Sequence, residues 1–386
     1  MEGTPTKKHV IDPNGDVIIH LRNFDAPFAV LPKNGQLYVP TAPSSIFGTD
    51  ITTSFGGIFN SQTKQPQLPS NGLKHEPIWA TAPRPGDNAV TSETQKEPST
   101  AQPEIHFQVS SAHLTLASRY FGRALRGAFK EAQPGIDGLR HVDASDWNAE
   151  ALLIVLRVIH GRNRQVPKRL SLETLAKIAV IVDYYDCHEA FDAFAEIWFQ
   201  QIEQSPVPDR LDRDLVLILH VSWVFRRADK FRDATKMVLL QSKGSLNTLN
   251  LPIPTEITSA INGRREKVLR HLGSVLGDLA ARFRQETPNC SFECASMNLG
   301  ALTRQIHNDK ELNDITISFG SLDGHSVVLS MKAARNIRSP AWNHSQPKGL
   351  FSPGYSCRLD TLVRISVAKV DEDLEGFSLE AFAKAV

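Results

Sequence analysis

One stretch of this chain, Phe107–Phe199, is dense in apolar residues and nearly free of proline after its first thirty positions. Its apolar side chains recur at helical spacing in several blocks, which predicts helices that each bury one face. The sequence has no glycine-rich phosphate loop, no HExxH motif and no GxSxG motif. Such a stretch is more typical of a folded interaction module than of an active site.

Three short strands accompany this stretch. Asp16–Leu21 is β-branched and follows a turn signal, Ile105–Val109 alternates, and Leu139–Asp143 is the third. Between the first two strands, residues 41–103 are rich in Pro, Ser, Thr, Gly, Gln and Asn and sparse in apolar side chains. Because so little apolar surface can be buried there, we expect a flexible insertion.

The helices are predicted from apolar spacing and from capping residues. Ser110 and Ser111 begin the first helix, which runs to about Leu125. The helices that follow are Trp147–His160 capped by Asp146, Leu172–Tyr184 capped by Ser171, Glu189–Gln200, Leu211–Phe225, Asp229–Leu240 and Ile257–Phe283. Gly263, Gly273 and Gly277 each weaken the last of these by about 1 kcal/mol relative to alanine, which predicts a kinked or split helix.

This order of elements, with the words FQVSSAHLTLASRYFGRAL, LRHVDASDWNAEALLIVLRVIHG and LSLETLAKIAVIVDYYDCHEAF, resembles the BTB/POZ domain. It is similar in particular to fungal BTB-domain proteins that open with an IDPxGDVIIxL strand. The resemblance implies an α+β fold, a small sheet capped by a helical cluster, in which Asp16–Leu21 pairs with Phe107–Val109. The implied division is 1–40 plus 104–200 for this domain, with 41–103 inserted, 205–286 as a mainly helical extension and 287–386 as a small C-terminal segment.

The resemblance also implies a function, which is protein–protein interaction without catalysis. BTB domains associate with themselves or with other BTB proteins, and we expect the apolar face of Ser110–Leu125, with Leu114, Tyr120 and Phe121, to meet the partner. Many BTB proteins are adaptors that bind cullin-3 through a hydrophobe-x-Glu motif, and Phe129-Lys130-Glu131 stands at that position. In the alternative interpretation Phe129 closes the core and Glu131 is solvated.

A zinc site is the candidate cofactor site. Cys290 and Cys294 lie four residues apart, which on a helix places both thiols on one face. His307 and Cys357 complete a Cys3His set, in which either His344 or His325 is an alternative to His307. The other interpretation is a set of free thiols that pack as small hydrophobes.

Two further groups of residues carry side chains that could be reactive or bind an anion. Cys187 and His188 are adjacent, and adjacent residues on a helix do not face each other, so a buried Cys187 is expected instead of a nucleophile pair. Two basic clusters, Arg162–Arg169 and Arg264–Arg270, leave a transcription-associated DNA-binding function as an alternative. Neither cluster has interleaved aromatic residues, so solvated faces are expected and nucleic acid is not a favoured partner.

The charge and hydropathy of the chain limit its surroundings. Forty-three basic against 42 acidic residues give a net charge of +1, which offers no general attraction to nucleic acid or an anionic membrane. The first residues lack the apolar core of a signal peptide, and no apolar run approaches the roughly 18–20 residues that span a bilayer. Four cysteines are too few for a disulfide scaffold. We therefore expect an intracellular protein, nuclear or cytoplasmic, with no small-molecule substrate.

Overall fold

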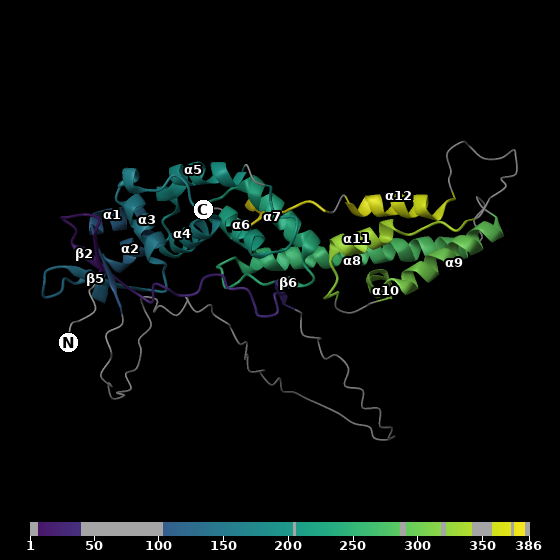
Figure 1. Ribbon diagram of the computed structural model, residues 1–386, viewed down its shortest axis with the longest axis horizontal. Helices are drawn as coiled ribbons and strands as arrows, with labels where there is room; N and C mark the ends of the chain where they lie inside the picture. Colours follow the sequence, from purple (N-terminus) through teal and green to yellow (C-terminus); the bar gives the residue numbers. More distant parts are fainter. Residues whose placement is uncertain are drawn as a thin grey trace, which may run out of the picture.

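The protein is an α+β structure, as predicted, with a small sheet at one end and helices that extend to the other (Figure 1). The computed structural model describes residues 7–39, 103–203, 206–285, 291–317, 322–341, 357–371 and 374–382. The predicted insertion, 41–103, lies outside these described residues except for Pro103.

Four strands form the main sheet in the order β1-β4-β2-β5. Their bounds are β1 Lys7–Val10, β2 Val17–Arg22, β4 Ile105–Val109 and β5 Arg140–Ser145. β2 pairs antiparallel with β4 and parallel with β5, so Ile19 lies between Phe107 and Val142. This confirms the pairing expected across the insertion. β1 was not predicted, because its residues carry a weak strand signal and are held only by parallel pairing with β4.

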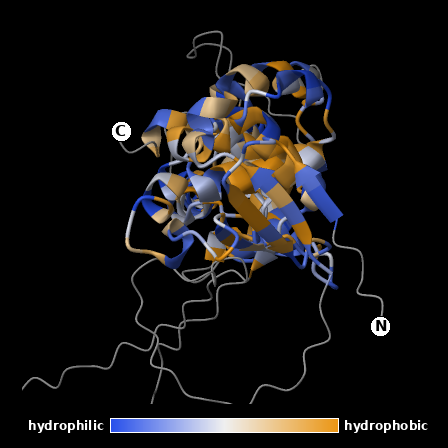
Figure 2. Cartoon of the chain, turned by 90° about the vertical axis from the view of Figure 1, so that its left-hand side faces the viewer, coloured by the Kyte–Doolittle hydropathy of each residue, from blue (hydrophilic) through white to orange (hydrophobic). Residues whose placement is uncertain are grey.

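The two faces of the sheet differ in polarity because side chains alternate along a strand. Val17, Ile19 and Leu21 have no exposed area, and Phe107 and Val109 from β4 are equally buried. Figure 2 shows hydrophobic segments gathered in the middle of this end of the molecule, with hydrophilic segments toward its outside. One face of the sheet therefore joins the helices in a core, and the residues between these positions point to the other face.

The predicted helix Ser110–Leu125 is two helices, α1 Ser111–Ala117 and α2 Arg119–Ala124. They are separated by Ser118, whose backbone is extended and whose hydroxyl accepts a hydrogen bond from Phe121 N and donates one to Tyr185 O. The cap of α1 also differs from the prediction. Ser110 makes no side-chain cap, and Ser111 N and Oγ instead donate to the Asp16 carboxylate, both at 2.8 Å.

The helical cluster beside the sheet follows the sequence-based prediction closely. Its members are α3 Ala149–Ile159, α4 Leu172–Tyr185, α5 Asp192–Glu203, α6 Arg213–Val224 and α7 Ala228–Gln241. Ser171 caps α4 as predicted, by accepting a hydrogen bond from Thr174 N. The cap of α3 is Asn148 and not Asp146, since Asn148 Oδ1 accepts from Ala151 N.

α8, Thr255–Arg284, is one continuous helix of 30 residues and is not split at its glycines. Gly273 allows a close approach, because a Cβ added there would lie 2.2 Å from Ile315 O. Gly263 and Gly277 have no other atom that close, and a Cβ at either would meet open space. The backbone contact with α10 thus requires glycine at one of the three positions.

The remaining helices pack around the second half of α8 and form a second hydrophobic core. They are α9 Phe292–Asn308, α10 Lys310–Ile317, α11 Val327–Arg335 and α12 Leu359–Asp371. The first half of α8 belongs to the core of the sheet and α3–α7. The packing therefore divides within α8, whereas the sequence-based boundary falls at 286/287. Because this second core is apolar, a metal ion is not required to explain its order.

Three small elements link distant segments. β3 Tyr38–Val39 pairs antiparallel with β6 Ser245–Leu246. Near the end of the chain, Phe377 N donates to Thr235 Oγ1 at 2.9 Å, and η5 Leu379–Ala381 lies against α7. The chain thus returns from the second core to the first.

The glycines of α8 provide a matched test of this packing. Gly273→Ala should lower the free energy of unfolding by about 1–3 kcal/mol, because its Cβ overlaps the backbone of α10. Gly277→Ala, at an exposed position of the same helix, should raise it by about 0.5–1 kcal/mol. Urea denaturation of both variants measures the two effects. Equal effects would contradict the close contact between α8 and α10.

His220 on α6 is fully buried, and neither ring nitrogen makes a hydrogen bond with another described residue. Burial lowers the pKa of His220 from 6.5 to about 4, although the charge of Asp183 acts in the opposite direction. The unfolded chain therefore binds a proton here below pH 6.5, whereas the folded chain does not until about pH 4. The stability that this group contributes is present above pH 6.5 and is lost as the pH falls toward 4.

We predict that this one histidine costs about 2 kcal/mol of folding free energy between pH 7.5 and pH 5.0. His220→Leu removes the titrating group. The drop in its free energy of unfolding from pH 7.5 to pH 5.0 should therefore be smaller than the drop in wild type by about 2 kcal/mol. His307→Leu, at an exposed position on α9, is the control and should keep the wild-type pH dependence. Denaturant unfolding at both pH values is the measurement. If the free energy of unfolding changes with pH by the same amount in wild type and in His220→Leu, the lowered pKa of His220 is refuted.

Candidate interaction groove

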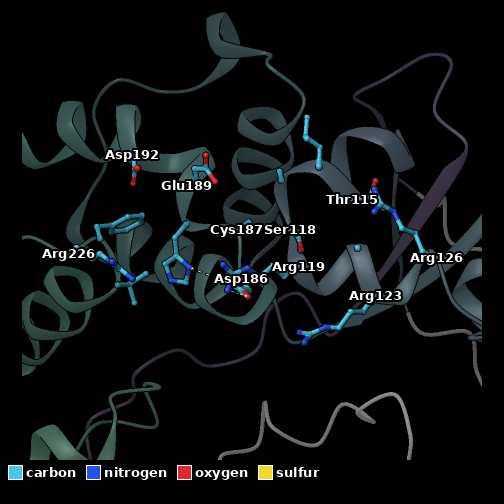
Figure 3. A pocket seen from close by; sticks show the side chains of 16 residues that line it. Thr115, Ser118, Arg119, Arg123, Arg126, Asp186, Cys187, Glu189, Asp192 and Arg226 are labelled. Carbon is cyan, nitrogen blue, oxygen red and sulfur yellow. Dashed lines mark ion pairs between the residues drawn. The ribbon is translucent and has the colours of Figure 1, made fainter. Parts of the chain in front are cut away.

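A groove of about 750 Å³ opens between the α1–α2 pair and the turn that follows α4 (Figure 3). One wall comes from α1 and α2, and the other from residues 186–192 and the end of α6. The lining residues include Thr115, Leu116, Ser118, Arg119, Arg123, Arg126, Asp186, Cys187, His188, Glu189, Asp192 and Arg226. We call this hollow the α2 groove.

Local backbone geometry fixes the two walls against each other. Asp186 takes a left-handed conformation, with φ of 48°, and so ends α4, after which η4 His188–Phe191 leads into α5. Arg119 N, at the start of α2, donates to Asp186 O at 3.3 Å. Ser118 binds the carbonyl of Tyr185, the residue before this turn. The start of α2 is therefore attached to the end of α4, and the groove lies beside this junction.

The α2 wall is basic, and the facing wall carries charges of both signs. Figure 3 shows Arg123 and Arg126 on the α2 side, and Glu189, Asp192 and Arg226 across the groove. Arg119 Nη1 lies 4.0 Å from Asp186 Oδ2 between them, and both side chains are well exposed. Exposed pairs of this kind contribute little to folding. Their charges are thus available to a partner.

Cys187 lines the groove, but its surroundings disfavour the thiolate that a nucleophile requires. The side chain is buried, and its thiol lies 3.7 Å from Val182 O. Burial raises the pKa of Cys187, and the charges of Asp186 and Asp183 act in the same direction. His188 points to the same two carboxylates, at 3.5 Å and 3.7 Å. The expected buried cysteine is confirmed, and Cys187 and His188 do not act as a pair.

Phe129 and Glu131 lie in the segment that follows α2, where η2 spans Lys130–Ala132. Both side chains are half-buried. Phe129 covers Gly127, where an added Cβ would meet its ring at 2.9 Å, and it is not among the residues packed on the hydrophobic core. The segment begins three residues after Arg126, which lines the groove.

Leu114, Tyr120 and Phe121 are placed differently from the prediction. Leu114 and Phe121 have no exposed area. Tyr120 is half-buried among Phe121, Tyr184 and Tyr185, with ring centroids 5.3–5.4 Å apart, and burial raises its pKa. The apolar face of α1 and α2 turns inward, onto the core. Leu114 and Phe121 therefore have a core role in place of the contact role expected from sequence, while Leu116 is 87% exposed at the rim of the groove.

The predicted zinc ligands assemble only in part. Cys290 and the alternative His344 lie outside the described residues. Cys294 and Cys357 come together through Asn298, whose Nδ2 lies 3.6 Å from Cys294 Sγ and donates to Cys357 O at 2.8 Å.

Neither described histidine joins these two cysteines. His307 is on the same helix as Cys294, 13 residues further on, which places it about 20 Å away along the axis. His325 instead contacts Glu311 and Asp314 at 3.1 Å and 3.2 Å. The set that includes His307 therefore cannot share one ion.

The second basic cluster is part of α8 and is not a solvated face throughout. Arg265 is fully buried and donates to the carbonyls of Leu322 and His325, at 2.8 Å and 2.9 Å. Arg264 stacks over the ring of Phe377, 4.0 Å from its centroid. Two of these cations therefore serve internal contacts, which weakens the case for a phosphate-binding surface.

Sequence reasoning missed a cluster on the outer face of the sheet. His20, Glu104 and His106 lie together there, on β2 and at the start of β4. The signal was present: histidine stands at an outward position in VIIHLR, in IHFQV and in RHVDAS. It became visible only when the strand register was known.

Comparison with known proteins adds no assignment. No protein-family model matches this chain, and a search of the curated proteins finds no match either. None of the helices in the described part of the chain combines the length and the apolarity needed to cross a bilayer. The function must be inferred from the groove and the sheet themselves.

Proposed function

We propose that this chain is a protein–protein interaction module of the BTB/POZ type, without catalytic activity, that associates with itself or with another protein of that type. The observation that carries the proposal is the α2 groove, an open hollow lined by exposed charges of both signs. The strand pairing also supports it, because β2 pairs with β4 across the long insertion, as the resemblance implies.

The arrangement of charge suits association of two copies. In a two-fold symmetric dimer each surface meets its own copy in reverse. Arg123 and Arg126 on the α2 wall would then face Glu189 and Asp192 on the other wall of the second chain, which also carries Arg226. Leu116, at the rim, is the apolar side chain best placed to be buried between them.

The first test is the oligomeric state of the full chain. Sedimentation velocity at tens of micromolar should find a dimer, and Leu116→Glu should convert it to a monomer because a charge replaces the apolar contact. Ile365→Glu is the matched control, since Ile365 is 58% exposed on α12, a helix that packs in the second core and away from the groove. A wild-type monomer at these concentrations, or a dimer unaffected by Leu116→Glu, would contradict self-association through the groove.

A second function, adaptor of a cullin-3 ubiquitin ligase, is favoured by the position of Phe129 and Glu131. Phe129 is outside the hydrophobic core and Glu131 is partly exposed, so both offer atoms to a partner. An aromatic anchor beside a charge that forms a rim ion pair is a common arrangement at binding hot spots. The segment follows the groove residue Arg126 closely in sequence, so this proposal has one partner helix contact both.

The adaptor proposal predicts that Phe129→Ala combined with Glu131→Ala abolishes capture of purified cullin-3. Lys130→Ala is the control, because Lys130 lies between the two and is well exposed. Pull-down with each variant measures binding, and sedimentation checks that the dimer persists. Undiminished capture by the double variant, or no capture by wild type, would remove the adaptor function and leave the dimer proposal standing.

A further inference from the structure

Three side chains of ligand type meet on the outer face of the sheet. His20 Nδ1 lies 3.0 Å from Glu104 Oε1 and 3.1 Å from His106 Nε2. His106 Nε2 lies 3.3 Å from Glu104 Oε2. All three side chains are between 17% and 27% exposed. We call these residues the His20 cluster.

Strand register produces this cluster. His20 and His106 are directly opposite each other in the antiparallel pair of β2 and β4. Glu104 precedes His106 by two residues, and residues two apart in an extended chain point to the same face. The backbone of the sheet therefore holds the three ligand atoms in place.

A chain of hydrogen bonds on one side of His20 determines which of its ring nitrogens carries the proton. His141 Nε2 lies 3.1 Å from Asp137 Oδ1 and so donates to it, which leaves His141 Nδ1 as an acceptor. His20 Nε2 lies 2.8 Å from that nitrogen and must donate. With the imidazoles neutral, His20 Nδ1 is therefore an acceptor, and its hydrogen-bond partner in the cluster is His106 Nε2, 3.1 Å away. This is the form in which histidine binds a metal, with its other nitrogen held by a hydrogen bond.

Two acceptors then face each other, His20 Nδ1 and Glu104 Oε1. Glu104 Oε1 is buried and makes no hydrogen bond with any other described residue. Arg22 Nη2 lies 3.2 Å from this oxygen, without hydrogen-bond geometry, and Arg22 also pairs with Asp143 at 3.2 Å. Because two acceptors repel at such a distance, a cation bound by both would stabilise the arrangement.

We propose that His20, Glu104 and His106 form a zinc-binding site, with a further coordination position open to solvent. Zinc bonds to nitrogen and carboxylate oxygen are about 2.0–2.2 Å, which places neighbouring ligand atoms of a tetrahedron about 3.3–3.6 Å apart. The observed separations of 3.0–3.3 Å need only a small outward shift. Two imidazoles and one carboxylate select zinc over magnesium or calcium, which take oxygen ligands.

The zinc ion would connect β2 to the start of β4, segments that are more than eighty residues apart in the sequence. An ion that binds the folded chain and not the unfolded one raises the melting temperature by mass action. The site is separate from Cys294 and Cys357, which lie by α9 and α12, and it is independent of the α2 groove.

The test uses the full chain with Cys290, Cys294 and Cys357 changed to Ser, so that thiol sites are removed. After chelator treatment and dialysis, a calorimetric titration with ZnCl2 should give one ion bound per chain. Thermal unfolding with and without ZnCl2 should show a higher melting temperature when zinc is present. Glu104→Gln and His106→Asn in this background should each weaken binding at least 100-fold. His307→Asn, at an exposed position on α9, is the control and should bind as before.

A cobalt spectrum tests the site without the Glu104→Gln and His106→Asn variants, so it stands even if those variants fail to fold. Co2+ added to this triple-Ser protein, in which Cys187 remains and is buried, should give ligand-field bands without a thiolate charge-transfer band. His141→Phe should weaken zinc binding by roughly 10-fold, because His20 loses the hydrogen bond that orients it. Absence of zinc and cobalt binding once the cysteines are removed would overturn the proposal, as would unchanged binding in Glu104→Gln and His106→Asn.

Discussion

The double pairing of β2 is the constraint on which the rest of the structure depends. β2 joins β4 on one side and β5 on the other, so three segments far apart in the sequence share one core. Asp16, just before β2, accepts two hydrogen bonds from Ser111 and pairs with Arg140. Burial acts to raise the pKa of Asp16, but these hydrogen bonds and the charge of Arg140 together lower it. One carboxylate thus holds the beginning of α1 and the beginning of β5 next to the start of β2.

Much of this fold could be predicted from local signals, and the exceptions share one physical cause. Ser171 caps α4 as predicted because its hydroxyl oxygen and the free N–H of Thr174 belong to the same helical turn. The break at Ser118 depends on the carbonyl of Tyr185, 67 residues away, and no local pattern contains that partner. In the same way, the sequence alone predicts that Gly273 weakens α8. The structure shows that glycine is needed there, because the backbone of α10 lies against it. Local propensity predicts an element, while tertiary contacts decide where it breaks and which glycine it needs.

The candidate sites were less predictable than the fold, for a related reason. Helical spacing identified the apolar face of α1 and α2 correctly, but spacing does not say whether that face meets the core or a partner. The single chain already buries Leu114 and Phe121, so the outer side of α1 is left to polar residues and Leu116. For the His20 cluster the deciding fact was register, because a shift of one residue would turn His20 or His106 to the other face.

The composition of the α2 groove determines what kind of association it supports. Exposed charge pairs contribute about 0–1 kcal/mol each, and their main effects are on orientation and on the rate of encounter. Complete burial of one leucine contributes about 1.5–3 kcal/mol. In the proposed dimer, Arg123, Arg126, Glu189, Asp192 and Leu116 would therefore give specificity and only modest affinity. A stable dimer of the proposed kind would also have to bury surface around the groove, and Phe129, three residues after Arg126 and partly exposed, is one apolar side chain that could contribute.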